Sequence, residues 1–81
     1  RLATAAHDGF ARALWPSHTP FDGDLIFAVS TAEKPVKDPA ITSLLLGHAA
    51  AICVARAIAL AVFSASSAAN DTRPTWSDRF G

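Results

Sequence analysis

Hydrophobic positions recur at helical spacing from Arg1 to about Leu14, which predicts a first helix. The stripe consists of Leu2, Ala6, Phe10 and Ala13. Gly9 weakens such a helix by about 1 kcal/mol relative to alanine, so we expect a packing reason for it. Pro16 ends the helix, because the residue before a proline is disfavoured in the α region.

A short, continuous apolar run, Leu25–Val29, follows a segment with the turn-forming residues Pro20 and Gly23. A run of this length between polar segments predicts a strand covered on both faces. A lone strand cannot pair its own backbone groups, so it has to join a sheet from another part of the protein. The expected order is helix, strand, helix.

The second half of the chain is dominated by an alanine-rich apolar segment from about Ala40 to Phe63. Asp38 is a suitable N-cap and Pro39 suits the first helical position, so a long helix is predicted. The remaining residues are polar, without periodicity from Asp71 onward, and predict a mobile tail. We therefore divide the chain into an incomplete domain, residues 1–65, and a tail, residues 66–81.

Composition limits the classes of protein. Hydrophobic residues make up 51% and charged residues 17% of only 81 residues, which indicates burial against another part of a larger core. Seven basic residues balance seven acidic ones without a basic run, so nucleic-acid binding is not expected. The single cysteine, Cys53, predicts a buried, inert thiol. Without an initial methionine, the chain is expected to begin downstream of a processing site or to be a fragment.

The long apolar segment also allows a membrane-associated protein as an alternative. From Leu44 to Phe63, a length that could span a bilayer, nine large apolar residues favour insertion by roughly 3 to 5 kcal/mol, whereas Arg56 near the middle opposes insertion by about 3 kcal/mol. The two terms nearly cancel. A buried helix explains the many alanines better, so we expect no membrane and a cytoplasmic location.

Asp22 and Asp24 are the sharpest candidates for chemistry. On an extended segment these two carboxylates point to the same side and could hold a proton, orient an ammonium or activate a nucleophile. Asp-Gly-Asp is equally good turn chemistry, and taken alone the pair favours a turn. A metal site is a third possibility, weakened by the lack of a clear third ligand. His7, His18 and His48 are interpreted as structural histidines, with catalytic bases as the alternative for the first two.

A longer block around this pair resembles the C-terminal block of the DmpA-type L-aminopeptidase/D-esterase family, which includes β-peptidyl aminopeptidases and nylon-oligomer hydrolases. The resemblance is close over about residues 1–30 and looser to about Phe63. It is carried by three runs: Ala6-His7-Asp8-Gly9-Phe10-Ala11-Arg12-Ala13; His18-Thr19-Pro20-Phe21-Asp22-Gly23-Asp24; and Ile26-Phe27-Ala28.

The resemblance implies an α/β fold, a fragment of a layered αββα sandwich similar to N-terminal-nucleophile hydrolases. Family members cut themselves before a serine or threonine, which becomes the nucleophile of an aminopeptidase or amidase. That residue is expected upstream of Arg1, so Asp22 and Asp24 are expected to be supporting carboxylates and the chain alone to be inactive. The implied partners are the large subunit, a short peptide, amide or ester substrate, and further copies of the enzyme; no cofactor or metal is implied.

One position departs from the family pattern, and other classes stay open. Trp15 stands where arginine or another polar residue is expected, which would alter the site entrance or a subunit contact. The alternatives to an enzyme fragment are an inactive remnant that keeps a packing surface and the membrane-associated helical protein. An acyltransferase of the ornithine-acetyltransferase type shares the self-processing logic but lacks this block.

Overall fold

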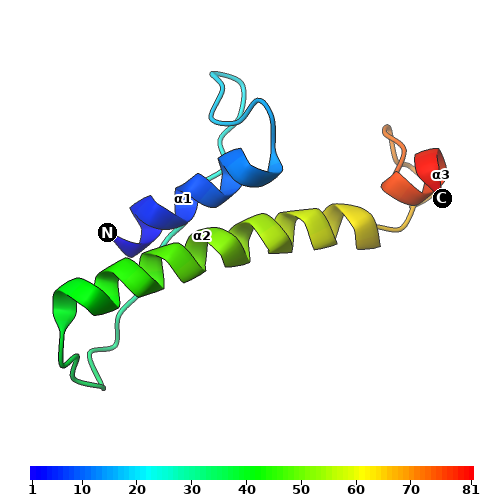
Figure 1. Cartoon of the computed structure of the whole chain (residues 1–81). Coiled ribbons are helices and arrows are strands. Elements are labelled where there is room, and N and C mark those ends of the chain that lie inside the picture. The colour runs from blue at the N-terminus through cyan, green and yellow to red at the C-terminus, as the bar shows by residue number, and fades with distance from the viewer.

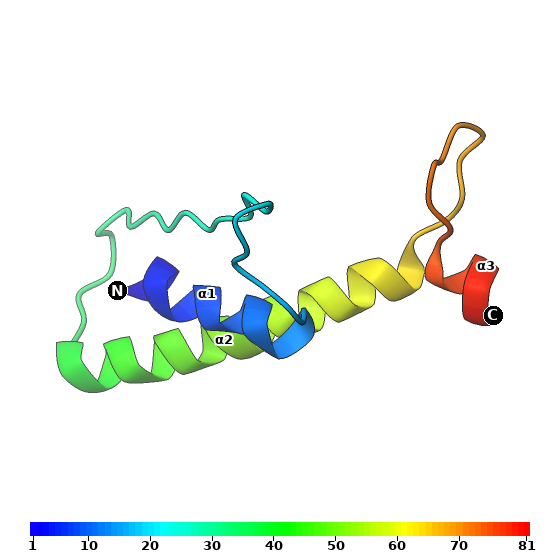
Figure 2. The ribbon, with the colours of Figure 1, turned by 90° about the horizontal axis from the view of Figure 1, so that it is seen from above.

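The computed structural model describes residues 1–81 and contains three helices and no β-strand. They are α1 (Leu2–Ala13), α2 (Pro39–Ser64) and α3 (Trp76–Phe80). Figures 1 and 2 show α1 lying along the N-terminal half of α2, with both helices running in the same direction. The segment between them returns beside the pair in the opposite sense (Figure 2). The fold is therefore helical, and the predicted α/β sandwich fragment is wrong.

Residues 25–29, the predicted strand, follow an extended path beside the helices (Figure 2) but form no strand and have no strand partner. A strand is stabilised by ladder hydrogen bonds to a neighbour, and this chain supplies none. Most of the run is exposed: Phe27 is 87% and Val29 89% exposed. Ile26 is the half-buried member, and its N–H donates to Nε2 of His7 at 3.3 Å. The prediction of a strand at residues 25–29 is therefore wrong.

Helices α1 and α2 meet through small residues. The four buried residues are Ala6, Gly9, Gly47 and Ala51, two from each helix. A Cβ placed on Gly9 would lie 2.6 Å from the carbonyl oxygen of Ala51 and 2.6 Å from Cβ of Val54. This close approach is the packing reason expected for Gly9. The apolar stripe of α1 is only partly buried, since Leu2 stays 40% exposed.

Helix α2 begins as predicted. The side chain of Asp38 accepts a hydrogen bond from the N–H of Ile41 at 3.2 Å, and Pro39 occupies the first helical turn. Cys53 is exposed rather than buried, so that expectation is wrong. By length and composition α2 could cross a membrane, but the core helix of a soluble protein passes the same test.

Residues 71–81 contain a regular element that the sequence pattern did not predict. Thr75 and Asp78 form a reciprocal capping box at the start of α3. The side chain of Ser67 donates a further hydrogen bond to Asp78. These bonds, from the Ser67 side chain first and then from Thr75, lower the pKa of the exposed Asp78 carboxyl below its usual value. The rings of Trp76 and Phe63 lie 4.8 Å apart, which brings α3 to the end of α2. The domain boundary at residue 65 and the mobility of the tail stay predictions.

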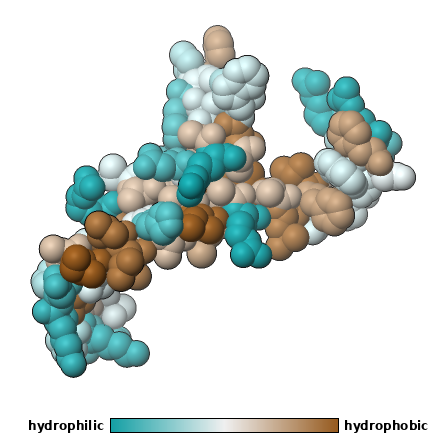
Figure 3. Space-filling model, viewed as in Figure 1, coloured by the Kyte–Doolittle hydropathy of each residue, from teal (hydrophilic) through white to brown (hydrophobic).

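The chain leaves much apolar surface uncovered. Its accessible surface is 6987 Å², against about 4,700 Å² for a compact monomer of this mass. Its radius of gyration is 16.3 Å, against about 12 Å for a compact chain of this length. Figure 3 shows hydrophobic surface along α2, including its C-terminal half. Leu44, Leu60 and Phe63 are each more than half exposed.

Candidate active site

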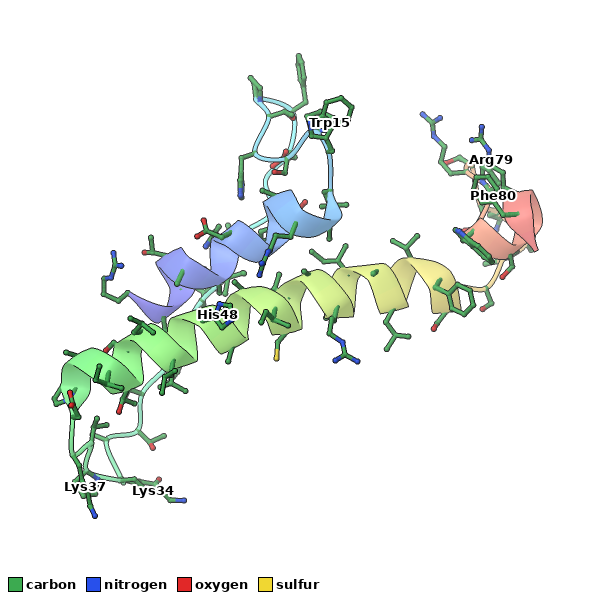
Figure 4. All side chains as sticks on the ribbon, viewed as in Figure 1. Trp15, Lys34, Lys37, His48, Arg79 and Phe80 are labelled. Carbon is green, nitrogen blue, oxygen red and sulfur yellow. The ribbon has the colours of Figure 1, made fainter.

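A cleft of about 320 Å³ lies where α1 ends and the following loop begins. Its nine lining residues come from the last turn of α1 and from the loop: Phe10, Leu14, Trp15, Pro16, Ser17, His18, Thr19, Asp22 and Asp24. Both carboxylates predicted as site residues therefore line one cleft. Trp15, labelled in Figure 4, lines it too and is 96% exposed. The substitution of a polar residue by Trp15 stays an expectation drawn from the family resemblance.

Asp22 is held in a tight turn. Its Oδ2 accepts hydrogen bonds from the N–H of Thr19 at 2.7 Å and from Oγ1 of Thr19 at 3.2 Å. The N–H of Asp22 donates in return to the carbonyl oxygen of Thr19 at 3.2 Å. The interpretation as a turn and the interpretation as a cleft residue are thus compatible, because one carboxylate oxygen serves the turn.

Asp24 differs from Asp22 in its surroundings. It is exposed, lines the same cleft, and its carboxylate accepts no hydrogen bond from the chain. A carboxylate without a protein partner can accept hydrogen bonds from a cationic group. Asp24 is therefore the better placed of the two to meet an ammonium or a nucleophile.

The two histidines near the cleft bond to the backbone, as a structural role requires. Nδ1 of His7 lies 2.7 Å from the carbonyl oxygen of Ala3, and Nε2 of His18 lies 3.3 Å from the carbonyl oxygen of His7. The rings of Phe10 and His18 meet edge to face at 5.6 Å. These contacts hold the start of the loop against α1.

His48 is exposed on α2 beside α1 (Figure 4), where it lines a shallow groove with Asp8 and Arg12. No group of three or more histidine, cysteine, aspartate or glutamate side chains lies close enough together to hold a metal ion.

Sequence reasoning missed two contacts at this site. The hydroxyl of Thr19 donates a hydrogen bond to Asp22, and the sequence analysis gave Thr19 no side-chain partner. It gave no partner to the ring of His7 beyond the helix, whereas the ring reaches Ile26, 19 positions further along the chain. The first contact could have been anticipated from Thr-x-x-Asp, a spacing typical of side-chain-bonded turns. The second depends on how the return segment folds.

Comparison with known proteins agrees with the resemblance of the block. Residues 1–74 match the model of peptidase family S58. The chain is 42% identical over 90 aligned positions to "Uncharacterized aminopeptidase Rv1333" of Mycobacterium tuberculosis and to "Uncharacterized aminopeptidase Mb1368" of Mycobacterium bovis. Each alignment covers 99% of this chain and 26% of the relative. It is 43% identical over 79 positions to "Uncharacterized aminopeptidase ML1167" of Mycobacterium leprae, with 85% of this chain and 22% of the relative covered.

This chain belongs to peptidase family S58, the family of the DmpA-type aminopeptidases. It spans about a quarter of the length of the curated relatives that it matches. No solved structure matches it.

Proposed function

We propose that this chain supplies the carboxylate loop of a self-processing aminopeptidase that hydrolyses N-terminal amide or ester bonds. The observation that carries the proposal is the placement of Asp22 and Asp24 on one cleft, within residues 1–74 that match the S58 family. The names of the relatives, all aminopeptidases, favour this reaction class.

The reaction proposed is acyl transfer to a serine or threonine outside these 81 residues. The nucleophile's oxygen attacks the carbonyl carbon of the substrate, and its proton passes to a base, for which its own α-amino group is suited. The carbon–nitrogen bond breaks, the amine leaves with that proton, and an acyl-enzyme ester remains. Water then hydrolyses the ester and restores the hydroxyl group.

Asp22 and Asp24 have different parts in this proposal. Asp22 is fixed through Oδ2 by Thr19 and shapes the loop. The carboxylate of Asp24 accepts no hydrogen bond from this chain. It is free to accept hydrogen bonds from an ammonium group, either that of the substrate or that of the nucleophilic residue. Such a charge-assisted bond is roughly twice as strong as a neutral one and would select substrates with an amino terminus.

The proposed partners are the large subunit and the remainder of the same precursor, together with short peptides, amides or esters. The uncovered apolar surface of α2 supports association with other protein, including further copies of the enzyme. The same surface favours a second candidate function, that of a packing subunit without activity.

The test uses the full-length protein and amino-acid p-nitroanilides. Asp24→Asn keeps the size of the side chain and removes its charge, so kcat/KM should fall on the order of 10²-fold without a change in thermal midpoint. Glu33→Gln removes a carboxylate charge from an exposed position in the segment between α1 and α2. It is the matched control and should leave kcat/KM unchanged.

Three outcomes count against the proposal or part of it. Equal turnover by Asp24→Asn and wild type would remove Asp24 from the site. A folded full-length protein with no turnover on any amide or ester would favour the packing subunit. Recovery of the full-length protein only with membranes would favour the membrane-associated alternative.

A further inference from the structure

His7 bonds to both ends of the loop that carries the two aspartates. Its carbonyl oxygen lies 3.3 Å from Nε2 of His18, where the loop begins. Its own ring nitrogen Nε2 lies 3.3 Å from the backbone N–H of Ile26, two residues beyond Asp24. One residue of α1 thereby closes the loop of residues 18–26 from both sides.

The partners of the His7 ring determine its tautomer. The carbonyl oxygen of Ala3 can only accept a hydrogen bond, so Nδ1 of His7, 2.7 Å away, carries the proton. The backbone N–H of Ile26 can only donate, so Nε2 is unprotonated. The ring is therefore neutral and both of its nitrogens are in use. The lone pair of Nε2 is thus engaged by the Ile26 N–H and is not free to accept a proton from a nucleophile.

The bond to Ile26 is the contact that locates the loop's far end. Ile26 is the half-buried residue of the extended run 25–29, and its neighbours Leu25 and Phe27 are 57% and 87% exposed. No other hydrogen bond joins the backbone of this run to a helix. Losing the acceptor at His7 would leave Ile26 N–H without its partner and would let Asp24 shift.

We propose that His7 is a positioning residue for the aspartate loop: its neutral ring accepts the Ile26 N–H and so fixes Asp24 in the cleft. The inference rests on the proposed function, in which Asp24 meets an ammonium group. His7 itself touches neither substrate nor nucleophile in this proposal. His7 affects turnover only by fixing the position of the Asp24 carboxylate.

Two amide substitutions separate this role from a general need for a side chain at position 7. In His7→Gln the side-chain oxygen can reach the place of Nε2, so the bond to Ile26 can be kept. In His7→Asn the shorter amide reaches only the place of Nδ1, so the bond to Ala3 can be kept and the bond to Ile26 is lost. His48→Asn, at an exposed histidine of α2 outside the aspartate cleft, is the control for losing an imidazole elsewhere.

The experiment measures kcat and KM of the full-length protein together with hydrogen exchange at the Ile26 amide. His7→Asn should lower kcat on the order of 10²-fold, the effect expected of a displaced site group, and should speed exchange at Ile26. His7→Gln should restore kcat to within about 10-fold of wild type and slow the exchange again. His48→Asn should match wild type in both measurements.

Failure of this inference can be told apart from failure of the proposed function. If His7→Asn is as active as wild type while Asp24→Asn is not, the aminopeptidase site stands and the positioning role of His7 falls. The role also falls if His7→Gln is as impaired as His7→Asn at the same thermal midpoint. If Asp24→Asn is fully active, the proposed function fails whatever His7 does. If neither His7 variant folds, hydrogen exchange at the Ile26 amide of the wild type still tests the proposal. Exchange at Ile26 as fast as at the exposed Phe27 would mean that the hydrogen bond to His7 does not hold the Ile26 N–H.

Discussion

The two halves of α2 meet very different surroundings. In the N-terminal half, Gly47 and Ala51 are buried against α1. In the C-terminal half, Leu60, Val62 and Phe63 are each more than half exposed, and the contact shown there is between Phe63 and Trp76 of α3. In the N-terminal half α1 covers the face with the small residues, while Leu44, Leu45 and Leu46 stay more than half exposed. At the C-terminal end the large apolar residues Leu60, Val62 and Phe63 lie beyond α1.

This difference follows from how closely helices can approach. Glycine and alanine let two helix backbones come together, so α1 lies directly against one face of the first half of α2. Large exposed side chains such as Leu60 instead need a surface that fits around them. The association proposed above therefore predicts that Leu60 is covered in the full-length protein, whereas Gly47 and Ala51 form an internal joint with α1.

The largest effect is expected from Leu60→Ala in the full-length protein. If the remainder of the protein covers Leu60, the loss of its buried side chain should reduce the free energy of unfolding by about 2 to 5 kcal/mol. Chemical denaturation measures this change. Thr72→Ala, at an exposed position of the tail, should change it by no more than about 0.5 kcal/mol. An equally small effect at Leu60 would mean that this half of α2 stays uncovered.

A glycine series tests the internal joint. Gly9→Ala should cost about 1 to 3 kcal/mol of unfolding free energy, since the new Cβ would lie 2.6 Å from the backbone of Ala51. Gly47→Ala should cost less, because its Cβ would lie 3.0 Å from the side chain of Ala5. Gly23→Ala has open space around the new Cβ and is the control. Equal thermal midpoints for all three variants would contradict the close contact.

The smallest effect concerns the bond network of α3. The pKa of Asp78 is lowered in the folded chain. The ionised carboxylate therefore stabilises the fold at pH values above its unfolded pKa near 3.8, and this stabilisation is lost as the pH falls through the lower folded pKa. In a Trp15→Phe background, the fluorescence of Trp76 should report release of α3 from Phe63 in this acidic range. Asp78→Asn should remove this pH dependence. A transition at the same pH in that variant would assign the change to another group.

Local signals predicted the first two helices and missed the third. Pro16 marks the end of α1, which finishes at Ala13, because proline disfavours helix in the residue before it. Asp38 caps α2 through a hydrogen bond that depends on neighbouring residues alone. The same kind of signal existed for α3 in Thr75 and Asp78, three positions apart, and it was missed because the short segment lacks hydrophobic periodicity.

The candidate site was predicted in part. Asp22 and Asp24 were selected as candidate site residues because of the block of residues around them, and both line one cleft in the structure. The sequence did not predict that Asp22 is hydrogen-bonded and Asp24 is not, because this depends on which of the two carboxylates Thr19 reaches. The role of each in catalysis stays a proposal.

The sequence by itself determined the first two helices of this protein, the turn chemistry of its aspartate loop and its membership of peptidase family S58, since caps, prolines and a long block are local information. Only the tertiary structure decided that Leu25–Val29 is extended without a strand partner and that Gly9 meets Ala51. It also brought the His7 ring to the N–H of Ile26. The physical reason is that pairing and packing depend on residues far apart in the chain, whose meeting no local pattern encodes.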